Sequence, residues 1–145
     1  MIREIKKEEL CQLLELYKNL NNNTMPIIND RILSLWDNIL SNNNYHIIVA
    51  VIDGKVVSSC TCIIIPNLTH NQRPYAFIEN VVTDSNYRNK GLATACLDYA
   101  KEIAISSNCY KIMLMTGSKK ESTLNFYRNA GYNSEDKTGF IMHLE

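Results

Sequence analysis

The stretch Tyr87–Ala95, YRNKGLATA, combines a glycine, small residues and two cations in a pattern that could hold a phosphate. A helix that begins just after Gly91 would present unpaired N–H groups and the positive end of its macrodipole to an anion. Gly91 has no side chain to block a close approach. Arg88 and Lys90 add positive charge, and the arginine fork matches phosphate oxygens. From these residues alone, a phosphate site and an ordinary loop with a solvated basic edge are both open.

The same stretch does not match the two common nucleotide-binding patterns. It lacks the second and third glycines of the dinucleotide fingerprint G-x-G-x-x-G, and it has no G-K-[ST] of a Walker loop. Lys plus Arg and Asp plus Glu number 15 each, so the formal net charge is zero. A general nucleic-acid binder needs a basic excess, and we expect no nucleic-acid partner.

Two further side chains could carry chemistry. Glu79 is a charge inside the apolar stretch Tyr75–Thr83, and burial of a carboxylate is costly unless it has a task. Burial would raise its pKa and suit it as a general base, directly or through water. The alternatives are an ion-paired glutamate on the sheet face and an edge residue in solvent. Tyr127 could donate a proton at neutral pH, since a phenol titrates near pH 10; alternatively, it is an amphipathic core tyrosine.

The elements that must position these residues follow from hydrophobic period. Alternation predicts strands at Ile2–Ile5, on both sides of the hairpin turn Asp53-Gly54, at Tyr75–Thr83 and in the tail Gly139–Glu145. Tyr110–Thr116 is a continuous apolar run, which predicts a buried central strand. Helical spacing predicts helices over 10–20, 32–40 with Asn29 or Asp30 as cap, 92–103, and from a capping box of Ser118 and Glu121 to Gly131.

The order of these elements predicts one domain over residues 1–145, an α/β fold with a mixed sheet flanked by helices. The five cysteines are odd in number and form no C-x-x-C pair, so we expect no disulfide framework or zinc site. Cys60 and Cys62 share a strand face and are expected to be buried thiols. The three histidines are scattered, and we expect no metal. No apolar run reaches membrane-spanning length, and MIREIKKEEL mixes acids and bases, so we expect no membrane partner, no targeting peptide and a cytoplasmic location.

Two motifs resemble a known family. YRNKGLA resembles the acyl-CoA-binding motif Arg/Gln-x-x-Gly-x-Gly/Ala of the GNAT N-acetyltransferases, filled here by Arg88, Gly91 and Ala93. NFYRNAGY, Asn125–Tyr132, resembles the second motif of that family, and the helix and strand between the motifs also agree. Within the family, IENVVTDSNYRNKGLA and NCYKIML are most similar to glucosamine-6-phosphate N-acetyltransferases and related small bacterial members, although Asn80 stands where those enzymes commonly have Asp.

This resemblance implies a mostly antiparallel, twisted GNAT-like sheet and acetyl-CoA as co-substrate, without a metal. It implies that the pyrophosphate lies on the backbone of Arg88, Asn89, Lys90, Gly91, Leu92 and Ala93, with Thr94 as an additional partner. It also implies that the pantetheine arm pairs with the strand at Val81, Val82 and Thr83. Tyr127 is then the general acid toward the CoA sulfur.

The function expected from these features is acetyl transfer from acetyl-CoA to a primary amine of a small molecule, such as an amino sugar, by direct attack in a ternary complex. An alternative is a catalytically silent acyl-CoA-binding sensor, and another is a protein or peptide N-acetyltransferase. The loops Asn21–Asp30 and Pro66–Pro74 are expected to select the acceptor. Similar proteins are often homodimers.

Overall fold

One five-stranded sheet organises the chain in the computed structural model, which describes residues 1–20 and 23–145. The strands lie in the spatial order β1-β2-β3-β4-β5, with bounds Ile2–Glu4, Tyr45–Ile52, Lys55–Ile65, Tyr75–Thr83 and Ile112–Leu114. The first four strands pair antiparallel, and β5 pairs parallel to β4. The predicted mixed, mostly antiparallel sheet is therefore confirmed. Residues 21–22 of the predicted loop Asn21–Asp30 lie outside the described residues.

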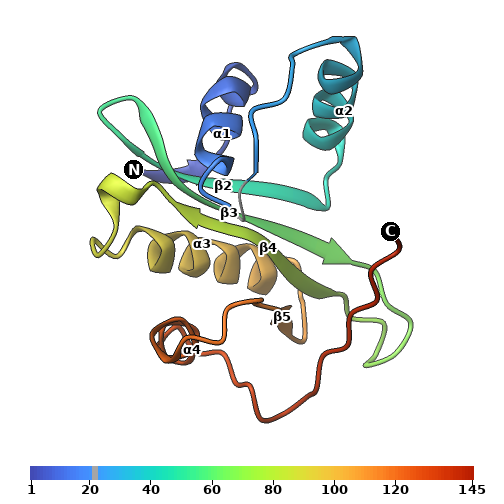
Figure 1. Ribbon diagram of the computed structural model, residues 1–145. Coiled ribbons are helices and arrows are strands. Elements are labelled where there is room, and N and C mark those ends of the chain that lie inside the picture. The colour runs from blue at the N-terminus through green and yellow to red at the C-terminus, as the bar shows by residue number, and fades with distance from the viewer. Residues whose placement is uncertain (21–22) are drawn as a thin grey trace.

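Helices cover both faces of the sheet (Figure 1). Two helices, α1 (Leu10–Tyr17) and α2 (Asp30–Ser41), lie on one face, and α3 (Leu92–Ser106) and α4 (Glu121–Asn129) on the other. Short 3-10 turns at Lys7–Glu9 and Ser85–Tyr87 precede α1 and α3. Each face has its own core: Cys96, Leu97 and Ala100 of α3 pack on the sheet from one side, and α1 packs with Trp36 of α2 on the other. No helix in the described part of the chain is both long and apolar enough to cross a membrane.

Local sequence signals placed two features correctly. Asp53 and Gly54 both have positive φ, 50° and 77°, as the predicted hairpin turn between β2 and β3 requires. Asn29 caps α2, because its side chain accepts a hydrogen bond from the Ile32 N–H at 3.0 Å. Both predictions are confirmed, and both depend on contacts within four residues of chain.

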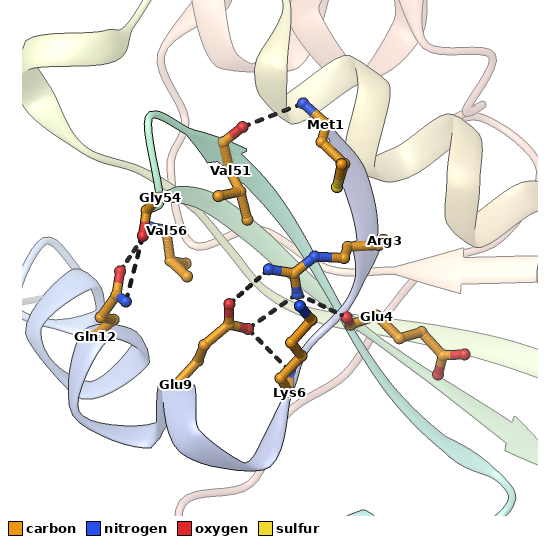
Figure 2. Close-up of polar contacts among 9 residues, drawn as sticks. All are labelled: Met1, Arg3, Glu4, Lys6, Glu9, Gln12, Val51, Gly54 and Val56. Atoms are coloured by element: carbon orange, nitrogen blue, oxygen red, sulfur yellow. Dashed lines mark hydrogen bonds and ion pairs between the residues drawn. The ribbon is translucent and has the colours of Figure 1, made fainter.

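A partly buried ion pair joins the N-terminal strand to the helix that follows it (Figure 2). The Arg3 guanidinium donates two hydrogen bonds to the Glu9 carboxylate, at 2.6 and 3.0 Å, and the Lys6 N–H donates to the same carboxylate at 2.9 Å. Glu9 is 7% exposed, so these three donors replace the water that the carboxylate loses. The hydrogen bond from Arg3 lowers the pKa of Glu9. The pair joins β1 to the turn that begins α1.

Strand β4 contains a bulge in its pairing with β3. The β3 register jumps from Ser59 opposite Val82 to Thr61 opposite Glu79, so β4 holds one extra residue there. Asn80 lies in this bulge with a φ of 52°, a left-handed conformation that asparagine tolerates better than most residues. Strand β5 pairs only with Ala76–Ile78, immediately before the bulge. Beyond Ile78, the β4 edge that faces β5 is unpaired within the described ranges.

Three predictions for the C-terminal half are wrong. The run Tyr110–Thr116 gives only the short strand β5, which is half-buried and lies at the sheet edge instead of its centre. The tail Gly139–Glu145 forms no strand, and β5 is an edge strand because nothing in the described chain pairs beyond it. Helix α4 begins at Glu121 after Lys120, and Ser118 instead accepts from the Lys120 N–H and donates to the Thr123 hydroxyl.

Candidate active site

A cleft of about 530 Å³ lies beside the end of β4, beyond the residues that pair with β5. Three segments far apart in the sequence form its walls: the end of β4, the start of α3 and the start of α4. The lining residues are Val81, Val82, Thr83, Tyr87, Arg88, Asn89, Gly91, Leu92, Ala93, Thr94, Ser122, Thr123, Phe126 and Tyr127. This set contains all the residues predicted to contact the co-substrate except Lys90, together with the predicted acid Tyr127.

The end of β4 supplies a free strand edge to the cleft. Because β5 stops pairing at Ile78, the backbone of Val81–Thr83 faces the cleft with one edge open. The opposite edge is held by β3, since Ser58 pairs with Thr83 and its hydroxyl donates to the Val82 carbonyl at 3.0 Å. An extended ligand could therefore add to β4 as a further strand would, through main-chain hydrogen bonds.

The start of α3 supplies the second wall. Gly91 precedes the helix with a φ of 75°, and Asn89 has a φ of 62°. The N–H of Ala95 makes the first hydrogen bond of the helix, to the Gly91 carbonyl at 3.0 Å, which leaves the earlier N–H groups for a ligand. Backbone N–H groups in such left-handed turns, at the positive end of a helix, are typical of anion sites. Arg88 in the same lining adds positive charge.

The turn between β4 and α3 is fixed by Asp84. Its carboxylate accepts from the Asn86 N–H at 2.9 Å and from the Lys55 ammonium at 3.2 Å. The backbone hydrogen bond is the larger cause of a lowered pKa for Asp84. Lys55 and Lys90 lie 5.3 and 5.4 Å from the centre of the Tyr87 ring, so Lys90 contacts this aromatic neighbour of the cleft. The sequence prediction missed Tyr87 because a single half-buried tyrosine in a short turn carries no motif.

Tyr127 of α4 is part of the cleft lining. Burial raises its pKa, so the phenol is protonated and able to donate at neutral pH. Its ring packs edge-on against Phe126 at 5.0 Å and Tyr132 at 6.4 Å. The helix ends as predicted, with Gly131 at a φ of 100° and the Tyr132 N–H bonded to the Tyr127 carbonyl at 3.0 Å. These contacts hold the hydroxyl-bearing ring in one place.

Glu79 is exposed and is not part of the cleft lining. Of the alternatives that the sequence left open, this is the residue in solvent and not the buried carboxylate. Its place immediately before the Asn80 bulge explains this, because β5 has already ended and leaves the position open to solvent. Its role as a base is untested and stays a prediction.

A polar cluster that sequence analysis missed lies on the α1 face of the sheet. Thr61 pairs with Glu79 and with Ile47, a core residue of the α1 side, so Thr61 and Glu79 share that face. The Thr61 hydroxyl is buried and has no hydrogen-bond partner among the described residues.

Two tyrosines lie beside this face. Burial raises the pKa of Tyr17 to about 12, and the nearby Thr61 and Asn80 side chains partly oppose this increase. Tyr45 also has a raised pKa, from burial and then from the Glu79 charge. Sequence analysis could not predict this polar cluster, since its residues come from four separate elements.

The cysteine and histidine side chains that could bind a metal lie outside the cleft lining. Cys60, Cys62 and Cys96 are buried, as predicted for the first two, and burial raises the pKa of Cys62 to about 12 and that of Cys96 to about 11. His46 contacts Glu4 at 2.6 Å, and His70 stacks on Tyr110 at 3.9 Å. Residues 1–20 and 23–145 contain no group of three His, Cys, Asp or Glu side chains arranged to hold a metal ion.

Comparisons with known proteins agree with this geometry. The model of the acetyltransferase (GNAT) family matches residues 8–132. Glucosamine 6-phosphate N-acetyltransferase of Trypanosoma brucei brucei is 34% identical over 84 residues, which cover 58% of this chain and 55% of that protein. The match therefore spans about half the length of that relative.

Two solved structures are similar over nearly the whole chain. A protein of Agrobacterium tumefaciens str. C58 that carries a provisional acetyltransferase name superposes with a TM-score of 0.92 at 37% identity. A protein of Bacillus halodurans C-125 named a transcriptional regulator superposes with a TM-score of 0.89 at 25% identity. Each alignment covers 99% of both chains.

Proposed function

This chain belongs to the GNAT acetyltransferase family, and we propose that it moves the acetyl group of acetyl-CoA to a primary amine of a small molecule. The observation that carries the proposal is the single cleft that joins an open strand edge, a helix start and the Tyr127 phenol. These are three partners that an acyl-CoA needs: one for its amide-bearing arm, one for its phosphates and one for its sulfur.

Acetyl-CoA fits this cleft segment by segment. The pyrophosphate would accept hydrogen bonds from the free N–H groups before Ala95, and Arg88 would offset its charge. The pantetheine arm would pair with the open edge of Val81–Thr83. Tyr127 of α4 lines the same cleft as that edge, and we assign it to the thioester end.

The reaction needs no covalent enzyme intermediate. The neutral amine attacks the thioester carbonyl carbon, the new C–N bond forms, and the C–S bond breaks as the electron pair leaves on sulfur. Tyr127 donates its proton to that sulfur. The proton released by the amine passes to Glu79 through water, since Glu79 is open to solvent and follows the β4–β5 pairing. The buried cysteines take no part.

The acceptor would approach from the α1 face. Glu79 is exposed on that face and carries a negative charge that attracts an ammonium group. Tyr17 and Tyr45 add phenol groups that remain protonated. Such a surface suits a small amine with several hydroxyl groups, and the name of the trypanosomal relative makes glucosamine 6-phosphate the first candidate to test.

Release of CoA, measured with a thiol reagent across a panel of amino sugars, other small amines and peptides, tests the proposal. We expect turnover with at least one small amine. Tyr127→Phe should lower kcat by about 10²-fold or more while CoA affinity stays within twofold, because only the transferable proton is lost. Tyr132→Phe is the matched control, since this neighbouring tyrosine is outside the cleft lining, and it should keep its activity.

The relative named a transcriptional regulator favours a second candidate, an acyl-CoA-binding sensor without turnover. The same panel separates the two functions. If CoA binds tightly and no amine is acetylated, the transferase proposal fails and the sensor remains. If peptides alone are acetylated, the reaction class stands and the small-molecule acceptor is wrong.

A further inference from the structure

Helix α1 ends beside the bulge in β4. The helix packs against both β3 and β4, and Tyr17, its last residue, packs on the same core as Val82 of β4. Burial raises the pKa of Tyr17 to about 12, and the nearby side chains of Thr61 and Asn80 oppose this increase. The Tyr17 hydroxyl is therefore protonated at neutral pH and lies close to the residue that forms the bulge.

Asn80 needs a contact that keeps it in its conformation. Its φ of 52° is left-handed, which is unfavourable for a residue with a side chain, and such strain persists only where the surrounding structure imposes it. The strand ladder does not impose it, because the β3 register passes from Glu79 to Val82 and β5 pairs only as far as Ile78. A contact between the Asn80 side chain and α1 can supply this constraint.

We propose that Tyr17 is a positioning residue for the co-substrate cleft. Its hydroxyl forms a hydrogen bond with the Asn80 amide, holds the β4 bulge in its left-handed form and so keeps the strand edge Val81–Thr83 open to a ligand. Tyr17 is not part of the cleft lining, so it acts on the cleft through Asn80. The expected effect on CoA rests on the proposed function, because it assumes that the pantetheine arm pairs with this edge.

A double-mutant cycle of Tyr17→Phe and Asn80→Gly tests the contact in the unliganded protein. Phenylalanine removes only the hydroxyl, and glycine removes the amide while it accepts the positive φ without strain. We expect Tyr17→Phe to raise the unfolding equilibrium constant about fivefold in the parent, the effect of one lost hydrogen bond, and less than about twofold in the Asn80→Gly background. Urea unfolding of the four proteins measures this coupling. Equal effects in the two backgrounds would overturn the contact, whether or not the protein is an acetyltransferase.

CoA binding by the same proteins tests the positioning role. Titration calorimetry should give an affinity about threefold or more below that of the parent for Tyr17→Phe, and near that of the parent for the double variant, in which glycine keeps the bulge without a contact.

Tyr99→Phe is the matched control for CoA binding. This half-buried tyrosine lies on α3, packs on the core of the opposite sheet face and is outside the cleft lining, so the variant should bind CoA as the parent does. Equal CoA affinity in Tyr17→Phe and the parent would overturn the positioning role. If the parent itself binds no CoA, the proposed function fails and the positioning role fails with it, while the unfolding cycle still reports the contact.

Discussion

We expect Gly91 to serve both the backbone and a bound phosphate. The sequence argument gave it one task, to leave room for a phosphate, but its φ of 75° gives a second. A Cβ at this position would meet no atom within 4 Å in the unliganded chain, so any cost of alanine here comes from backbone conformation and not from a clash. The two tasks can be separated by substitution.

We predict that Gly91→Ala lowers the free energy of unfolding by about 1–2 kcal/mol, the cost of left-handed backbone for an L-residue. Gly91→Glu should have a similar stability cost and, in addition, weaken CoA binding at least tenfold, or about 1.4 kcal/mol, because a carboxylate would enter the phosphate site. Urea unfolding and titration calorimetry measure the two effects. Equal CoA affinity in the glutamate variant and the parent would remove this loop as the phosphate site.

At the scale of elements, the bulge in β4 creates the cleft. Without the extra residue at Asn80, β4 would continue its pleat, and β5 could pair along more of its length. The free edge at Val81–Thr83 and the exposure of Glu79 both follow from this one irregularity. A strand that splits from its neighbour is unusual in a packed sheet, and here it opens the space that a ligand can fill.

Substitutions at Asn80 test this role. Asn80→Val should lower the free energy of unfolding by about 1–2 kcal/mol and raise the KM for acetyl-CoA severalfold, since β-branched residues disfavour a φ of 52° and favour regular strand. Asn80→Gly accepts this φ without strain and is the control, with KM near that of the parent. Unfolding and steady-state kinetics report both quantities. If valine leaves KM unchanged, the bulge is not what holds the cleft open.

At the scale of the whole molecule, the Arg3–Glu9 pair joins the edge strand β1 to the turn that begins α1. Strand β1 has only three residues in the ladder and depends on contacts outside it. The Glu9 side chain is 9% exposed and that of Arg3 21%, so solvent screens this pair less than it does the surface pairs. Loss of the pair should therefore affect global unfolding.

We predict that Glu9→Gln lowers the free energy of unfolding at pH 7 by about 1.5–3 kcal/mol, the range for hydrogen bonds to a charged group. The folded pKa of Glu9 is lowered, so its contribution is present above the unfolded pKa, near 4.3, and is lost as the pH falls through the folded pKa. The parent and the variant should therefore converge in stability below about pH 4. Glu8→Gln, at the exposed neighbour, is the control and should change stability little. A constant difference down to pH 2 would contradict the assignment.

The sequence by itself determined the features whose signals lie within a few residues. The Asp53-Gly54 turn, the Asn29 cap and the glycine before α3 each depend on local backbone preference, which does not change with the rest of the fold. The order of strands and helices was also accessible as far as α4, because hydrophobic period reports element type. The loop that we propose to hold the phosphates could be predicted for the same reason, since its backbone donors come from consecutive residues that line the cleft.

Only the tertiary structure decided the rest. Whether Tyr110–Thr116 is central or at an edge depends on which strands pair beside it, and the Asn80 bulge, which exposes Glu79, depends on register against β3. Tyr17, Tyr45 and Thr61 come together from three elements, so no stretch of sequence contains them. The tail has the alternation of a strand, but it pairs with none of the five strands of the sheet. Pairing partners and register arise from long-range contacts, and hydrophobic period along one chain does not specify them.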